Sequence, residues 1–346
     1  MKKFLALLLA LVMVFALAAC GESNEPSPAT SGGDTASGEP TYVWKLAHPY
    51  NEGSSNYEAC ELFAETINEI SGGAIQVDVF PSNTLGTTEE VEEGLAYGTT
   101  DIVYESIASL GNWSELANID AYPYLYSSLD HFLAVWQSDF GEQLREEIGE
   151  QGGFKMVGTL YRGTRVVTST KPINSIDDFN GFKIRTPTQQ MYIKTWERLG
   201  ATSTPLASAD IFTAIQQGTV DGQENPIVDS WNFGLYDVCD YVIKTNHVYS
   251  QCTFIFDRSK YEAFPEEVKG WIDEAVKVVE DYKNDFTVEE EQEYYQRWED
   301  YGATIIEVDM QEYMDAFATF AEDEFPEFVD YIEQIRAMDP ALSSAA

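Results

Sequence analysis

The stretch TYVWKLAHPYNEGSSNYEACELFAETINEISGGAIQVDVF, residues 41–80, decides the fold because it contains a strand, a helix and a second strand in succession. Residues 41–48 are typical of a strand, and residues 74–80 alternate apolar and polar side chains as a strand does. Between them, residues 55–70 place their large apolar side chains on one helical stripe. The stretch therefore predicts a strand–helix–strand unit.

The same alternation continues along the chain. Thr87 begins a predicted helix that ends near Tyr97, and residues 100–106 are apolar enough for a central strand. The later predictions are, in order, helix 128–150, strands 154–161, 165–170 and 182–187, helices 189–199, 208–217 and 226–236, strands within 241–257, and strand 304–308. Strands separated by helices of this length imply parallel sheets with crossover connections, so we expect an α/β fold.

A long helix is predicted near the C-terminal end. Residues 271–300 contain neither Gly nor Pro, which gives a helix of about 30 residues, or about 45 Å. Its apolar stripe comprises Val268, Ile272, Ala275, Val279, Tyr282 and Phe286. A coiled coil is the alternative, but the stripe covers fewer than four heptads, which favours one helix lying across a globular body.

Residues 1–20, MKKFLALLLALVMVFALAAC, are typical of a secretory signal. Two lysines precede an uncharged apolar run from Phe4 to Ala19, which is shorter than the roughly 20 residues of a membrane span. The end of the run, residues 17–20, resembles a bacterial lipobox, in which the cysteine is lipidated and becomes the new N-terminus. We therefore expect a lipoprotein signal peptide at 1–19 and a lipid on Cys20. The alternative is an ordinary signal peptide with a chance cysteine.

Residues 21–40, GESNEPSPATSGGDTASGEP, predict a tether. They contain no aliphatic residue larger than Ala and no basic residue, and such a composition cannot bury enough surface to fold. Residues 20–40 are therefore interpreted as lipid anchor and flexible linker, and the folded part as 41–346.

The composition excludes some classes of partner. The chain carries 20 Lys and Arg against 59 Asp and Glu, a formal charge of −39, and this field repels phosphate backbones. We therefore expect no nucleic-acid partner, and membrane attachment only through the N-terminal anchor. Apolar residues reach 44% and aromatic residues 13%, well above the content of a disordered acidic chain.

Cysteine and histidine give no sign of a metal or a cofactor. The spacing of the cysteines resembles no zinc or redox motif, and the three histidines are isolated. We interpret the histidines as structural and expect neither metal nor cofactor. Cys239 and Cys252 flank a short apolar segment and are candidates for pairing across a hairpin, which would leave Cys60 as a buried free thiol.

A cationic segment interrupts the acidic chain. Between Gly152 and Trp196 there are seven basic residues and two acidic ones. Arg165 and Arg185 fall within its predicted strands, where side chains project from a sheet. These arginines either pair with the protein's own carboxylates or bind an external anion. Helical arginines with acids nearby, Arg145, Arg198, Arg297 and Arg336, are assigned to structural pairing.

Four motifs then occur in order: YRGTR (161–165), KPINSIDDFNGFKIRTP (171–187), a helix ending in GTVDG (218–222), and QENP (223–226). With KLAH, FPSNTLG and DIVYES in the N-terminal part, they resemble the solute-binding proteins of tripartite ATP-independent periplasmic (TRAP) transporters, of the dicarboxylate-binding (DctP) type. The resemblance covers residues 41 to about 335 and implies that the chain is not an enzyme.

The resemblance also implies a ligand site. Arg185 matches the arginine that clamps the ligand carboxylate, a role that suits a planar guanidinium which keeps its proton. Arg165 matches a second arginine on the same anion, and Asn225 an amide that donates to the ligand. Glu105 matches a carboxylate that accepts from ligand hydroxyl or amine groups, unless it only pairs with an arginine. The loop Pro49, Tyr50 and Asn51 lies where family members touch ligand.

One position departs from the family pattern. Several members carry an aromatic residue that stacks on the ligand at or beside Ser208, whereas this chain offers Ser208 itself, with Phe212 a turn away. The expected pocket therefore lacks an evident bulky stacking residue. Together with Glu105, this favours a hydroxylated sugar acid such as a uronate, with C4-dicarboxylates and keto acids as alternatives.

The resemblance implies a two-domain, periplasmic-binding-protein-like clamshell with the long helix spanning both domains. Its boundaries are 41–162 with 251–290 for domain I, and 163–250 with 291–346 for domain II. The expected function is capture of an organic acid outside the cytoplasm and delivery to the membrane subunits of a TRAP transporter. A sensor subunit for a signalling receptor is one alternative, and a hydrolase with paired carboxylates is another, although no nucleophile motif supports it.

Overall fold

The computed structural model describes residues 39–343, so the predicted signal peptide, Cys20 and almost all of the tether lie outside the described residues. Within that range the strands are β1 (Tyr42–Ala47), β2 (Ile75–Phe80), β3 (Ile102–Glu105), β4 (Phe154–Ser169), β5 (Lys183–Thr186), β6 (Thr202–Pro205), β7 (Gly222–Pro226), β8 (Tyr241–Asp257) and β9 (Thr304–Glu307). Among the described residues, no helix combines the length and the apolar character that a membrane crossing requires.

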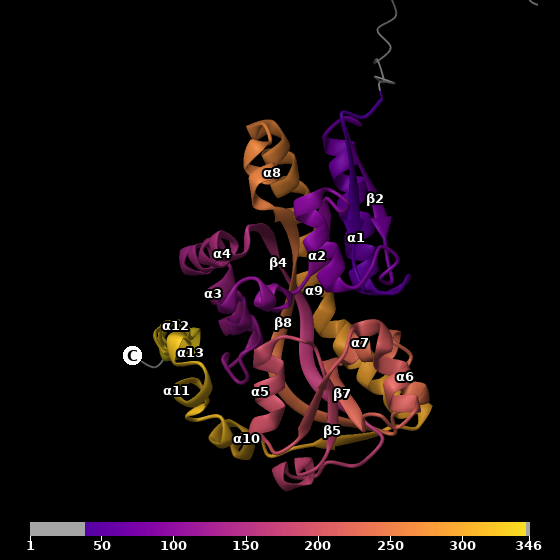
Figure 1. Ribbon diagram of the computed structural model, residues 1–346, viewed down its shortest axis with the longest axis vertical. Helices are drawn as coiled ribbons and strands as arrows, with labels where there is room; N and C mark the ends of the chain where they lie inside the picture. Colours follow the sequence, from indigo (N-terminus) through magenta and orange to yellow (C-terminus); the bar gives the residue numbers. More distant parts are fainter. Residues whose placement is uncertain (1–38, 344–346) are drawn as a thin grey trace, which may run out of the picture. The chain divides into compact units, whose positions relative to one another are not determined.

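Helices cover the strands and connect them (Figure 1). The α-helices are α1 (Ser55–Ile70), α2 (Thr88–Tyr97), α3 (Leu129–Trp136), α4 (Asp139–Gly152), α5 (Gln190–Arg198), α6 (Ile211–Gln216), α7 (Ile227–Asn232), α8 (Arg258–Ala263), α9 (Glu266–Tyr301), α10 (Met310–Ala316), α11 (Phe320–Glu324), α12 (Val329–Ala337) and α13 (Pro340–Ser343). Short 3₁₀ segments are η1 (Ile107–Asn112), η2 (Glu115–Ala121), η3 (Ile176–Phe179), η4 (Ser208–Asp210), η5 (Leu235–Asp237) and η6 (Pro326–Phe328).

The described strands form one mixed sheet in the order β2-β1-β3-β8-β4-β7-β5-β6, with β9 also paired to β8. Strands β2, β1 and β3 are mutually parallel, as are β7, β5 and β6, which confirms the predicted crossover units. Between these groups, β4 and β8 pair antiparallel along nearly their whole length. The two long strands therefore join one parallel group to the other, as Figure 1 shows.

Two features of the sequence prediction are corrected by this sheet. The strands predicted at 154–161 and 165–170 are one strand, β4, and β8 likewise runs unbroken from Tyr241 to Asp257. Register shifts interrupt the β4–β8 pairing next to Gly158 and Gly163, both with positive φ. Bulges of this kind break the alternation of side chains without ending the strand, so the pattern resembled two strands.

The cysteine pairing considered from the sequence is wrong. Cys60, Cys239 and Cys252 are all buried free thiols. Because β8 is a single extended strand rather than a hairpin, Cys239 precedes its start while Cys252 lies in its second half, opposite Leu160 of β4.

Helix α9 spans residues 266–301 and is longer at both ends than predicted. Its first half buries Val268, Ile272 and Val279 in one hydrophobic cluster with α1 and β1, and its last turns bury Trp298 in another with α6 and α7. The helix therefore contacts both parts of the sheet, as expected. The predicted apolar stripe does not continue, however, because Phe286 is 40% exposed.

The middle of α9 buries polar side chains instead. Glu291 accepts hydrogen bonds from the Tyr161 hydroxyl at 2.9 Å and from the Thr164 backbone N–H at 2.7 Å, on either side of Gly163. A Cβ at Gly163 would lie 3.2 Å from Glu291 Oε1, and φ there is +115°, so the position requires glycine. Burial raises the pKa of Glu291 to about 7, although both hydrogen bonds oppose the shift.

We expect Glu291→Gln to change how stability depends on pH. The folded pKa of Glu291 lies above its unfolded value, so its stabilising contribution is complete below the unfolded pKa and lost as pH rises through about 7. Relative to the variant, the wild type should lose on the order of 2–3 kcal/mol between about pH 4.5 and 7. Urea denaturation across that range measures this. Exposed Glu289→Gln on the same helix is the control, and parallel wild-type and Glu291→Gln profiles would contradict the assignment.

Candidate functional site

A pocket of about 710 Å³, partly open to solvent, lies where several strands end. Residues from the carboxyl ends of β1, β3, β5, β6 and β7 line it, as in other α/β sheets whose crevices form outside the strand ends. The lining residues are Pro49, Thr87, Thr88, Glu89, Glu105, Ser106, Ser109, Arg162, Arg165, Arg185, Pro187, Thr188, Gln189, Tyr192, Leu206, Ala207, Ser208, Asn225 and Phe233.

Three buried arginines converge on this pocket: Arg162 and Arg165 from β4, and Arg185 from β5. Arg165 and Arg185 were candidates from the sequence. Arg162 was not assigned a role, although it stands in the same YRGTR motif. Guanidinium groups stay protonated, so their pairing with carboxylates decides what the pocket can bind.

Arg165 already has a carboxylate partner. Its Nε and Nη2 donate to the two oxygens of Glu224 at 2.5 and 2.7 Å, a bidentate pair. Burial opposes ionisation of Glu224, but the Arg165 guanidinium prevails and lowers the carboxyl pKa to about 2. His247 Nε2 lies 3.1 Å from Glu224, and Tyr192 stacks under Arg165 with 4.9 Å between guanidinium and ring. Arg165 is therefore held in place and largely neutralised.

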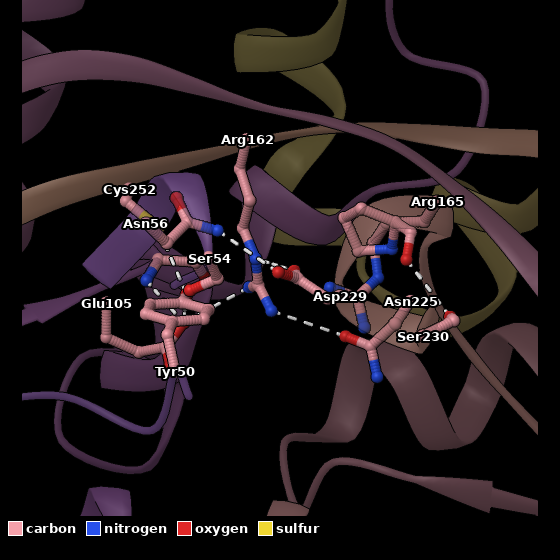
Figure 2. A network of polar contacts seen from close by, with 12 residues as sticks. Tyr50, Ser54, Asn56, Glu105, Arg162, Arg165, Asn225, Asp229, Ser230 and Cys252 are labelled. Atoms are coloured by element: carbon pink, nitrogen blue, oxygen red, sulfur yellow. Dashed lines mark hydrogen bonds and ion pairs between the residues drawn. The ribbon is translucent and has the colours of Figure 1, made fainter. Parts of the chain in front are cut away.

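Arg162 faces two carboxylates (Figure 2). Its Nε donates to Asp229 at 2.7 Å, and its Nη1 donates to Glu105 at 3.1 Å. Its Nη2 donates to the Asn225 side-chain oxygen at 3.3 Å, and its guanidinium lies over the Tyr50 ring. This arginine connects β4 to β3 and to α7, and its charge is more than balanced.

Arg185 differs from the other two. Its Nε and Nη2 donate to the Leu206 carbonyl at 2.9 and 2.5 Å, and none of the carboxylates in residues 39–343 forms an ion pair with it. Its side chain is only 4% exposed. Burial lowers the pKa of Arg185 to about 10, although Glu224 pulls the other way. It is a buried cation without a counter-ion, on the wall of a pocket.

Glu105 presents one oxygen to the protein. Its Oε1 accepts from the Ser106 backbone N–H at 2.8 Å and from Arg162 and the Tyr50 hydroxyl, each at 3.1 Å. Within the described part of the chain, no hydrogen bond reaches its Oε2. Because Glu105 lines the pocket, this oxygen is available as an acceptor.

The other predicted site residues divide into two groups. Pro49, Ser208 and Asn225 line the pocket, and Asn225 donates one amide N–H to Gln223. Tyr50 and Asn51 do not line it. Tyr50 is 1% exposed and lies behind Glu105, while Asn51 donates to the Asn232 carbonyl at 2.6 Å.

The sequence predicted no evident bulky stacking residue because Ser208 stands at the position compared, but the pocket does contain large aromatic side chains. Tyr192 of α5 and Phe233, which follows α7, both line the pocket, whereas Phe212 does not. Tyr192 and Phe233 lie in other segments of the chain, so comparing the single position of Ser208 with the family could not identify them. Sequence reasoning also missed Glu89, at the start of α2, whose only signal is its place in an acidic first turn. Among the described residues, no cluster of three or more His, Cys, Asp or Glu side chains could hold a metal ion.

The chain matches a known protein family and is similar to individual members of known function or structure. Residues 46–324 match the family described as bacterial extracellular solute-binding protein, family 7. A solute-binding protein of Roseobacter denitrificans is 34% identical over 267 residues, 77% of this chain and 81% of that protein. The sialic acid-binding periplasmic protein SiaP of Vibrio cholerae is 29% identical over 79% of this chain and 85% of its own length.

Solved structures agree with these matches. A TRAP periplasmic solute-binding protein from Roseobacter denitrificans with bound L-galactonate superposes with a TM-score of 0.82 at 30% identity, covering 86% of this chain and 99% of that one. Another, from Ochrobacterium anthropi with bound L-fuconate, has a TM-score of 0.80 at 26% identity, covering 86% and 99%.

The different pairing of the arginines predicts different effects on the stability of the ligand-free protein. Arg165→Met leaves Glu224 without its guanidinium partner and should lower the free energy of unfolding by about 3–5 kcal/mol. Arg185→Met removes hydrogen bonds to Leu206 but also an unpaired buried charge, so the loss should not exceed about 1 kcal/mol. Chemical denaturation compares the two variants. Equal losses would show that Arg185 has an internal counter-ion.

Proposed function

The chain belongs to family 7 of the bacterial extracellular solute-binding proteins, which are not enzymes, and on that premise we propose that it captures a hydroxylated sugar acid for a TRAP transporter. The observation that carries this proposal is Arg185, a buried guanidinium without a counter-ion on the pocket wall. A ligand carboxylate supplies the missing charge through two parallel hydrogen bonds, which are strong where water is excluded.

The neighbouring residues have distinct roles in this proposal. Arg165, fixed by Glu224, and Asn225 stand beside the ligand carboxylate, and Glu105 accepts from a ligand hydroxyl through its free Oε2. Tyr50 acts through Glu105, which it holds in position. Pro49 and Ser208 shape the wall. L-Galactonate and L-fuconate, held by the solved relatives, combine one carboxylate with several hydroxyl groups, which supports this ligand class.

We also propose that the pocket closes between the two predicted domains. The hydrogen bonds that connect them around the site include Asn51 to Asn232, Asn83 to Ser208, and Thr188 to Glu89. Closure buries the ligand carboxylate against Arg185, and the membrane subunits release the ligand by favouring the open form. Lipidation of Cys20, with residues 21–40 as tether, would keep the protein close to those subunits.

Replacement of the clamp tests the proposed function. Arg185→Lys should weaken binding by about 2–4 kcal/mol, because an ammonium group cannot form the two parallel hydrogen bonds of a guanidinium. A calorimetric screen of aldonates, uronates, keto acids and C4-dicarboxylates identifies the tightest ligand, and that ligand is then titrated into the variant. Lys194→Arg, outside the pocket, is the control. A loss smaller than tenfold would show that the anion binds elsewhere, and preference for a keto acid or dicarboxylate would overturn the sugar-acid assignment.

The lipid anchor predicts a separable phenotype. Cys20→Ala should abolish lipidation and release the protein from the membrane fraction, or leave an unprocessed precursor. The purified binding part should keep its ligand affinity, since the pocket is built entirely from residues 49–233. Uptake in cells should fall through a lower local concentration at the membrane. Fractionation and ligand titration of the same mutant check both links, and retention of the mutant on the membrane with cleaved signal would contradict lipidation.

A further inference from the structure

The charges on the pocket wall are unevenly distributed. Arg165 and Glu224 neutralise one another, whereas Arg162 faces two carboxylates, Glu105 and Asp229. A further carboxylate, Glu89, lines the pocket from the first turn of α2. Among the pocket-lining residues and their ion-pair partners, Arg185 is thus the one uncompensated cation, and the remainder carries excess negative charge.

Glu89 resembles Glu105 in the way it is held. Its Oε1 accepts from Thr188 Oγ1 at 2.5 Å and from Asn112 Nδ2 at 3.1 Å. No hydrogen bond from the described residues reaches its Oε2. Among the described residues, two carboxylates in the lining therefore each use one oxygen to hold the protein together and leave the other without a protein partner. Such oxygens accept from hydroxyl groups and repel a carboxylate.

Glu92, one turn further along α2, behaves differently. It is fully buried behind Ser109, whose hydroxyl donates to its Oε1, and its Oε2 has no partner. Burial raises the pKa of Glu92 well above its usual range, although the Ser109 hydrogen bond opposes this, and the nearby Glu105 and Glu89 charges add to the shift. Burial therefore favours the neutral carboxylic acid of Glu92, whose side chain does not line the pocket.

We propose that Glu89, together with Glu105, makes the pocket selective for acids with a single carboxylate and a neutral hydroxylated chain. This inference rests on the proposed function, which it narrows by excluding dicarboxylates. The first carboxylate binds Arg185. A second carboxylate at the far end of the same carbon chain would meet the oxygens of Glu89 and Glu105 that have no protein partner. Among the described lining residues, no other unpaired cation is left there to receive it.

A matched pair of six-carbon acids tests the proposal. L-Galactonate ends in a CH₂OH group, and galactarate carries a second carboxylate at the same place. In calorimetry on the mature chain at pH 7.5, the dissociation constant of galactarate should be at least 100-fold higher than that of L-galactonate. Glu89→Gln keeps the Oε1 acceptor for Thr188 and Asn112 but removes the charge, so it should narrow that ratio at least tenfold.

Glu92→Gln is the control on the same helix, because it replaces a buried carboxyl group that does not line the pocket with an amide of the same size and should leave the ratio unchanged. Galactarate binding within tenfold of galactonate, or an unchanged ratio in Glu89→Gln, would overturn the proposal. If neither of these acids nor any other aldonate or uronate binds, the proposed function fails instead. The pair 4-hydroxybutanoate and succinate then tests the charge rule alone, and tighter binding of succinate would overturn it.

Discussion

The burial of Arg185 without a carboxylate partner is the constraint on which the site depends. An unpaired charge in a protein interior is unfavourable, and here burial lowers the guanidinium pKa while Arg165 and Arg162 add repulsion. The fold tolerates this because Leu206 accepts two of its hydrogen bonds and the pocket remains open beside it. In the function that we propose, the same unfavourable charge becomes the main source of affinity once a carboxylate enters. Stability of the free protein and affinity for the ligand would then be opposed at one residue.

In the same proposal, the rest of the site leaves Arg185 as the arginine that pairs with the ligand carboxylate. Arg165 and Arg162 would compete for that carboxylate if they were also unpaired, but Glu224 pairs with Arg165, and Glu105 and Asp229 pair with Arg162. These pairs come from strands and helices that the long strands β4 and β8 hold together, and α9 supports the bulge at Gly163 between the two arginines of β4. The framework therefore fixes both the unpaired cation and the paired ones that surround it.

The sequence predicts those features of the structure that depend on neighbouring residues, and not those that depend on residues far apart in the chain. The unit β1-α1-β2 followed from hydrophobic periodicity, because each element buries one face. The continuity of β4 could not be predicted in this way, because the bulge at Gly163 interrupts the alternation of apolar and polar side chains along the strand. Arg185 was found through its motif. The contact between Glu89 and Thr188 joins residues 99 positions apart, and no local pattern could indicate it.

The central claim is that the ligand carboxylate supplies the counter-ion of Arg185, and a crystal structure of the protein with its tightest-binding sugar acid tests it most directly. The account predicts both carboxylate oxygens within about 3 Å of the Arg185 guanidinium nitrogens. The hydroxyl groups of the bound sugar acid should lie toward Glu105 and Glu89. A carboxylate bound to Arg162 instead, or a hydroxyl group in contact with Arg185, would contradict the account.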